Sequence, residues 1–360
     1  MNPKVQKNLF DIPKLMKAVV YYRNDDVRLE ERPVPEIGPG EILVRTEAVG
    51  LCGSELTEYH MLSRAPLVMG HEPTGVVVKI GEGVTKFKLG DRVVVHHHVG
   101  CMSCHHCHRG NFSMCENFKK SHLDPGGSCE YFRVPEENTR FDTHILPENV
   151  SFEVGSLVEP LGCAMRGVKI TPIRPGDTVV VIGMGFVGRS YLELIRHSPA
   201  GKIVVTDLND WRLEEALKHG ATHAINSGKE DPVARLIEIN NGYLADEVFV
   251  IVPNIKVWNQ GITMAEKGAT IHFGTPMPPD MDWTINPNKL WFSEIKFTFT
   301  YSSTHVEMAA VLDMIAAGHM EPEALITHRF GMDQVPEAIQ MYKDAGPSLK
   351  QLIIPSLTKA

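Results

Sequence analysis

The stretch Asp177-Thr178-Val179-Val180-Val181-Ile182-Gly183-Met184-Gly185-Phe186-Val187-Gly188 decides the fold expected for this chain. Its first half is an apolar run of β-branched residues, which is typical of a buried strand. Gly183, Gly185 and Gly188 follow in G-x-G-x-x-G spacing, and an apolar-periodic segment through Arg196 predicts a helix after them. Gly183 permits a tight turn, and Gly185 lets the backbone approach a pyrophosphate bound at the start of the helix. The stretch therefore predicts a dinucleotide-binding unit.

A second strand candidate, 202–206, follows that helix and ends at Asp207. An acid at this place accepts hydrogen bonds from the adenosine ribose hydroxyls and repels a 2′-phosphate, so the sequence favours NAD over NADP. The alternative for Asp207 is a helix N-cap. Arg212 is placed to flank the adenine.

Strands and helices keep alternating after Asp207, which is typical of a parallel α/β sheet. We expect strands at 247–252, 269–274 and 295–301, and a helix near 257–264. The tail should alternate helix 306–317, strand 324–330, helix 335–345 and strand 349–354, and return to pack on the N-terminal part. Upstream of the glycine loop, 151–159 is expected to be a helix with Ser151 as its N-cap.

The N-terminal third is rich in short β-branched runs separated by Gly and Pro clusters, which predicts a small β-barrel. The expected strands are 17–22, 41–45, 75–80 and 92–96.

His71 and Glu72 are adjacent in the loop 70–75 and offer an imidazole nitrogen and a carboxylate oxygen to a metal ion. Cys52 upstream and Glu159 downstream can add a thiolate and a second carboxylate. This donor set suits a catalytic Zn²⁺, which takes three protein ligands and keeps one position open. The alternative is an ordinary surface turn.

Four of the seven cysteines fall in the spacing C-x-x-C-x-x-C-x7-C at Cys101, Cys104, Cys107 and Cys115. Four thiolates close a tetrahedral zinc site and leave no room for substrate, so this site is expected to be structural. The alternatives are free thiols or an iron–sulfur centre. The histidines around the cluster are expected to be strand and surface residues.

Composition excludes several classes of protein. The formal net charge of −8 argues against a nucleic-acid binder such as a zinc-ribbon module. No apolar run reaches the roughly 20 residues that span a bilayer, and no secretory signal is apparent. We expect a cytoplasmic protein without nucleic-acid or membrane partners.

Together, Gly70-His71-Glu72, the four-cysteine lobe and the glycine loop with Asp207 resemble the zinc-dependent medium-chain dehydrogenase family from Met16 onward. Cys52-Gly53-Ser54 and Val158-Glu159-Pro160-Leu161 are most similar to the sorbitol (polyol) and threonine dehydrogenase branch. The resemblance implies a GroES-like β-barrel catalytic domain (1–160 and 302–360) and a Rossmann parallel-sheet NAD-binding domain (161–301). It also implies an active site between them, two zinc ions per chain, and a homo-oligomer, with a tetramer favoured over a dimer.

By this resemblance Cys52, His71 and Glu72 ligate the catalytic zinc, and Glu159 is a ligand or a carboxylate that exchanges with water. Ser54 would begin the proton relay from the substrate hydroxyl. The residues implied to line the nicotinamide side are Phe186, Val187, Gly274, Thr275, Thr298, Phe299 and Thr300.

Two departures from the branch, at Thr57 and around Arg166, bear on the substrate. Thr57 stands where branch members often carry a relay histidine, so His60 can substitute, or the proton can leave through Ser54. Arg166 can reach an anionic group on the substrate or form a structural ion pair. Cys163 is read as a bystander. Just after the cysteine lobe, Lys119, Lys120 and His122 are expected in a solvated loop, with a polar or anionic substrate as the alternative contact.

The expected function is reversible NAD-dependent oxidation of a secondary alcohol of a polyol or sugar derivative, with or without an anionic group, to a ketone. The alternatives are an amino-alcohol dehydrogenase of the threonine type and a non-catalytic protein that retains the fold.

Overall fold

The β-branched runs of the N-terminal third form strands in the computed structural model, which describes residues 10–359. They are β1 (Leu15–Arg23), β2 (Asp26–Pro33), β3 (Ile42–Gly50), β4 (Leu67–Val68), β5 (Pro73–Ile80), β6 (Arg92–Val95), β7 (Tyr131–Val134) and β8 (Thr143–Ile145). β1 pairs with β2 and β4 in a small sheet, and β3, β5, β6 and β8 are neighbours in a second sheet, with β7 pairing on β3. The strands expected at 17–22, 41–45, 75–80 and 92–96 are confirmed.

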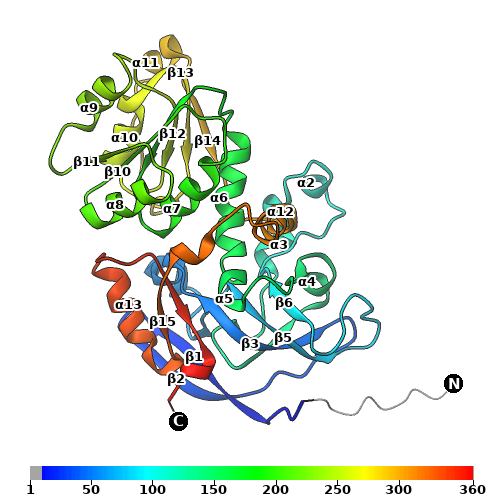
Figure 1. Cartoon of the computed structure of the whole chain (residues 1–360). Helices are drawn as coiled ribbons and strands as arrows, with labels where there is room; N and C mark the ends of the chain where they lie inside the picture. Colours follow the sequence, from blue (N-terminus) through cyan, green and yellow to red (C-terminus); the bar gives the residue numbers. More distant parts are fainter. Residues whose placement is uncertain (1–9, 360) are drawn as a thin grey trace.

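The C-terminal tail returns to this sheet, as expected. It contains α12 (His305–Ala316), β15 (Ile326–Phe330), α13 (Val335–Lys343) and β16 (Lys350–Ile353). β16 pairs antiparallel with the end of β3, where Leu352 lies opposite Gly50. This pairing brings Lys350 beside the loops that follow β3 and precede β5, and Figure 1 shows the red tail against the blue strands.

The second half of the chain forms a six-stranded parallel sheet in the order β11-β10-β9-β12-β13-β14. The strands are β9 (Thr178–Ile182), β10 (Lys202–Asp207), β11 (His223–Asn226), β12 (Ala245–Val250), β13 (Ala265–Phe273) and β14 (Lys296–Phe299). The helices between them are α7 (Phe186–Ile195), α8 (Asp210–Lys218), α9 (Pro232–Ile239), α10 (Ile255–Met264) and α11 (Pro287–Ser293). β9 is buried along its whole length, because helices cover both faces of a parallel sheet.

The helix expected at 151–159 is two helices, α5 (Phe152–Gly155) and α6 (Val158–Ile170), with a break at Ser156 and Leu157. The Ser151 side chain caps α5 by accepting a hydrogen bond from the Val154 N–H, as predicted. Figure 1 shows α6 running between the β-rich half and the parallel sheet. The exact domain limits at 160 and 302 stay a prediction.

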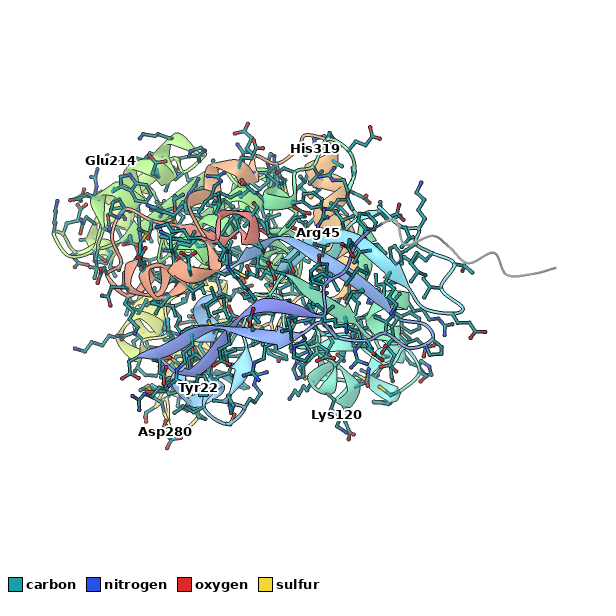
Figure 2. The ribbon with its side chains drawn as sticks, turned by 90° about the horizontal axis from the view of Figure 1, so that it is seen from below. Tyr22, Arg45, Lys120, Glu214, Asp280 and His319 are labelled. Carbon is teal, nitrogen blue, oxygen red and sulfur yellow. The ribbon has the colours of Figure 1, made fainter. Side chains whose placement is uncertain are left out.

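Short helices complete the N-terminal half: α1 (Glu58–Met61), α2 (His105–His108), α3 (Glu116–Lys120) and α4 (Glu136–Phe141). Lys120 projects from the outer edge of the lobe formed by α2 and α3, far from Glu214 on α8 (Figure 2). One apolar cluster joins the two halves, because Val94 and Leu146 belong to the same core as Leu161, Val181 and Leu192. Within residues 10–359, the helices are all too short or too polar to cross a lipid bilayer.

Candidate active site

Cys52, His71 and Glu72 converge although separate loops carry them. Cys52 follows β3, and His71 and Glu72 lie immediately before β5, which pairs antiparallel with β3. One ligand atom from each of the three lies within 4.8 Å of the others. A thiolate, an imidazole and a carboxylate at this spacing fit a zinc ion with an open position.

Glu55 orients the metal-binding loop, and the sequence analysis missed it. Its Oε1 accepts a hydrogen bond from the Gly70 N–H at 2.6 Å and lies 3.2 Å from His71 Nδ1. Burial alone would raise the pKa of Glu55, but the neighbouring His71 outweighs it and lowers that pKa, which keeps the carboxylate ionised. With Nδ1 held by a carboxylate, His71 presents Nε2 to a metal.

Lys350 is the second residue that sequence reasoning missed. Its Nζ lies 2.5 Å from Glu72 Oε2, and both side chains are buried. Burial alone would lower the pKa of Lys350, but the Glu72 carboxylate outweighs it and raises that pKa. Glycine is required at Gly50, because a Cβ there would lie 1.8 Å from Glu72 Oε2.

The other carboxylate oxygen of Glu72 remains available. Glu72 Oε1 is buried and has no hydrogen-bond partner within residues 10–359. A buried carboxylate oxygen without a partner is costly unless something binds it, and a zinc ion shared with Cys52 and His71 would satisfy it.

Glu159 on α6 lies in a different group from the one expected. Its ligand oxygen lies within 4.8 Å of ring nitrogens of His96 and His97, a set separate from Cys52, His71 and Glu72. His96 Nε2 is 3.6 Å from Glu159 Oε1, and its Nδ1 is 2.8 Å from Asp142 Oδ2. Burial alone would raise the pKa of Glu159, but His96 outweighs it and lowers the pKa to about 2. Whether Glu159 reaches the zinc stays a prediction.

One expectation near Glu159 is wrong, because His96 and His98 are buried and are not surface residues; β6 ends inside the molecule and the chain continues through its interior. The Sγ of Cys163 donates a hydrogen bond to Glu159 Oε1 at 3.3 Å, one helical turn along α6. That Cys163 is a bystander of the zinc site stays a prediction.

The proton-relay candidates are exposed or half-buried. Ser54 is exposed, and its hydroxyl donates to Cys52 Sγ at 3.3 Å. Thr57 directs its hydroxyl to the Gly53 carbonyl at 3.3 Å. His60 is exposed and lies against Arg64.

The cysteine lobe matches a closed zinc site. Sγ atoms of Cys101, Cys104, Cys107 and Cys115 all lie within 4.8 Å of one another. Phe112 and Phe118 pack against them as a small separate cluster. His105, His106 and His108 are exposed, in agreement with the expectation for these three.

The glycine loop has the geometry of a dinucleotide cradle. Gly183 has a φ of +97°, and a Cβ on Gly188 would lie 1.7 Å from the Gly183 carbonyl oxygen. Gly185 is the N-cap of α7, and Arg212 Nη1 lies 3.6 Å from where a Cβ on Gly185 would stand. The guanidinium therefore lies beside the N-terminus of α7, and its contact with the adenine stays a prediction.

Asp207 is the last residue of β10, and its side chain bonds to the glycine loop. Its Oδ2 accepts from the Met184 N–H at 2.6 Å, and its Oδ1 accepts from the Asn209 N–H at 2.8 Å. The N-cap alternative for Asp207 is wrong, because Asn209 caps α8.

Comparison with known proteins identifies the family. The alcohol dehydrogenase GroES-like domain model matches residues 38–143, and the zinc-binding dehydrogenase model matches residues 186–317. The chain is 36% identical to L-threonine 3-dehydrogenase of Caldanaerobacter subterraneus, covering 91% of this chain and 95% of the relative. It is 31% identical to sorbitol dehydrogenase of Gallus gallus, covering 91% and 93%.

The chain belongs to the zinc-dependent medium-chain dehydrogenase family. It has the GroES-like plus Rossmann fold, and it is a zinc-dependent alcohol or polyol dehydrogenase that uses a nicotinamide dinucleotide. An alcohol dehydrogenase of E. coli CFT073 complexed with NADH aligns with a TM-score of 0.85 at 26% identity, covering 95% of this chain and all of that one. A zinc-binding dehydrogenase of Sinorhizobium meliloti bound to NADP aligns with a TM-score of 0.85 at 25% identity, over the same shares.

The residues predicted on the nicotinamide side of the dehydrogenase gather around β13 and β14. Thr298 lies opposite His272 in the parallel register, and its Oγ1 is 3.1 Å from His272 Nδ1. Thr300 Oγ1 is 3.4 Å from His272 Nε2, and the exposed Phe299 stacks on Phe273. His272 was missed, because a lone histidine in a strand is not distinguished by any sequence pattern.

The remaining predicted nicotinamide contacts follow the carboxyl ends of β13 and β9. Gly274 and Thr275 directly follow β13, and Thr275 Oγ1 is buried without a partner within the described residues. Phe186 opens α7, and Lys350 Nζ lies 4.3 Å from its ring centroid. Val187 is exposed beside it.

The Arg166 guanidinium forms hydrogen bonds with other residues of the protein. Its Nη1 donates to Ser113 Oγ and to the Tyr301 carbonyl, both at 2.7 Å. These bonds tie α6 to the cysteine lobe and to the segment after β14. They support a structural role for Arg166 and not a contact with substrate.

Proposed function

We propose that this dehydrogenase reversibly oxidises a secondary alcohol of a polyol or sugar derivative to a ketone with NAD. The observation that carries the proposal is the three-residue donor set beside the glycine loop: Lys350 contacts Glu72 on one side and Phe186 on the other. One residue therefore links the candidate metal site to the start of the dinucleotide cradle.

The residues have distinct tasks in this proposal. Cys52, His71 and Glu72 would hold a zinc ion, which when bound supplies a Lewis acid for the substrate oxygen. A bound nicotinamide would supply the hydride acceptor. Ser54, exposed beside Cys52, takes the hydroxyl proton toward solvent. His272 and Glu55 hold their neighbours in place for these steps.

NAD is the proposed cofactor, because the Asp207 carboxylate would repel the extra phosphate of NADP. Solved relatives are bound to NADH in one case and to NADP in another, so family membership alone does not set the preference.

Amino-alcohol oxidation is the second candidate, supported by 36% identity to a threonine dehydrogenase. We also propose a cytoplasmic homo-oligomer, with a tetramer favoured over a dimer.

A rate survey tests the proposal. NAD⁺ reduction is measured across polyols, sugar derivatives and amino alcohols with the wild-type enzyme and with Cys52→Ser. We expect turnover of polyols or their derivatives, and loss of turnover in Cys52→Ser with NADH binding retained. Full activity in Cys52→Ser would contradict the role of the donor set, and exclusive turnover of amino alcohols would favour the second candidate.

A further inference from the structure

Four side chains of basic residue types lie outside the donor set: His60 and Arg64 from the α1 region, and Lys119 and His122 from the segment around the end of α3. All four are exposed. They come from two segments distant in sequence, and we call them the basic rim.

Histidine rings in contact connect the rim to the candidate zinc ligand. The ring centroids of His71 and His97 are 4.7 Å apart, those of His97 and His98 are 3.9 Å apart, and those of His98 and His122 are 5.0 Å apart. His98 Nδ1 also lies 2.8 Å from the Ser121 carbonyl, which fixes the segment that carries His122. His122 is thus three ring contacts from the metal position.

The α1 side of the rim faces the same space. Arg64 Nη2 is 3.1 Å from His60 Nε2. Burial lowers the pKa of His122, and the charges of Arg64 and His60 lower it further. Tyr301, whose ring lies 6.0 Å from Lys119 Nζ, is within reach of the charges of both Arg64 and Glu159.

The basic rim lacks a counter-charge. Arg64 and Lys119 form no ion pair with any residue of the described range 10–359, whereas the adjacent Lys120 pairs with Glu116. The nearby Glu55 is already bonded to Gly70 and His71. Burial lowers the pKa of His60 and His122, so the charge of the rim comes from Arg64 and Lys119.

We propose that the basic rim binds an anionic group on the alcohol, so that the substrate is a phosphorylated, sulfonated or carboxylated polyol or sugar derivative. The inference rests on the proposed dehydrogenase function and names its substrate class. Arg64 supplies the planar guanidinium that suits a bidentate oxyanion, and Lys119 and the two histidines add donors. Arg166 is left out of the rim, because its Nη1 already donates to Ser113 Oγ and to the Tyr301 carbonyl.

The test compares matched alcohols. kcat/KM for NAD⁺ reduction is measured with one polyol and with its phosphate ester, its sulfonate and its carboxylate, each with the wild-type enzyme, Arg64→Gln, Lys119→Gln and Lys120→Gln. We expect at least one anionic form to exceed the neutral parent by tenfold or more. Arg64→Gln should reduce that advantage about tenfold, mainly through KM, and Lys119→Gln should reduce it less.

Lys120→Gln is the matched control, since Lys120 is adjacent to Lys119 but paired, and it should keep the full advantage. Inorganic phosphate should inhibit competitively against the preferred alcohol. Equal kcat/KM for the neutral and all anionic forms, or an equal loss for both in Arg64→Gln, would overturn the inference while leaving the dehydrogenase function intact. Turnover of none of the alcohols would overturn the proposed function itself.

Discussion

Single side chains set the chemistry of this site from outside the expected ligand set. Glu55 and Lys350 each bond to one candidate ligand, Glu55 to His71 and Lys350 to Glu72. Their carboxylate and ammonium groups decide which ligand atoms remain free for a metal. Substitutions at these positions should therefore reduce the affinity for zinc more than they reduce the stability of the fold.

Glu55→Gln should weaken zinc binding at the catalytic site by about 10- to 100-fold, as is typical for a residue that orients a histidine ligand. The measurement is zinc retained per chain during titration with a chelator. Glu58→Gln is the control, because Glu58 is exposed on the neighbouring helix. Equal zinc retention in Glu55→Gln and wild type would contradict the role of Glu55.

Asp207→Asn should reduce the preference for NAD over NADP by roughly 10- to 100-fold, since a hydrogen bond to a charged group contributes about 1.5–3 kcal/mol. Asn keeps one acceptor for the Met184 N–H, so the loop should be disturbed less than by Ala. The ratio of kcat/KM for the two cofactors measures the effect. Asp210→Asn, whose carboxylate bonds Asn226 and Lys229, should leave the ratio unchanged.

The buried carboxyl group of Glu247 should make the stability of the folded protein depend on pH, independently of the candidate active site. Burial raises the pKa of this carboxyl to about 7, whereas the unfolded value is about 4.3. The folded state holds the proton of Glu247 more tightly than the unfolded state does. The free energy of unfolding therefore falls as the pH rises from about 4.3 to about 7.

Glu247→Gln removes the ionisation and should raise Tm by about 2–4 °C at pH 8, which corresponds to roughly 1 kcal/mol. At pH 4 the same substitution should change Tm little. Thermal unfolding at both pH values measures the difference, and the exposed Glu214→Gln is the control. A shift that is the same at both pH values would refute the assignment.

At the scale of elements, the cysteine lobe depends on its metal. The apolar cluster between α2 and α3 contains the four cysteines with only Phe112 and Phe118, too few side chains to fold without a cross-link.

Cys107→Ser should therefore lose one zinc per chain and open the lobe to protease between 101 and 120, with NADH binding preserved. Metal counting and limited proteolysis check this. His106→Gln, an exposed residue of the same helix, should keep the metal and the protection. An intact zinc count in Cys107→Ser would argue against a four-cysteine site.

Helices and strands with a clear repeat of apolar residues could be predicted from the sequence, whereas a break within a predicted helix could not. β9, the glycine loop and α7 follow directly from the apolar run and the G-x-G-x-x-G spacing. The break between α5 and α6 was missed although Gly155 directly precedes it, because a single Gly inside a helical pattern does not by itself end a helix.

At the scale of the whole molecule, the β14 edge of the Rossmann sheet is expected to form an interface with a second copy of the chain. β14 is the last strand of the sheet, and next to it α11 exposes Trp291 (79%) and Phe292 (75%). An open edge beside large exposed aromatic side chains is typical of a surface covered in an oligomer.

Trp291→Glu should weaken self-association by roughly 30-fold or more, as expected for an aromatic residue at the centre of an interface. Light scattering across a dilution series measures the mass of the assembly. Tyr243→Glu is the control, because Tyr243 is also exposed (65%) but lies before β12. A monomeric wild-type enzyme would refute the oligomer itself.

The sequence by itself determined the donor types, the cysteine spacing, the glycine loop and Asp207, because each depends on residues close together in the chain or on a motif with one structural context. Only the tertiary structure decided the partners of those donors. It placed Lys350 on Glu72, Glu159 beside His96, and His122 against His98. The physical reason is that these contacts join side chains from strands, helices and loops distant in sequence, and no local period records which of them will meet.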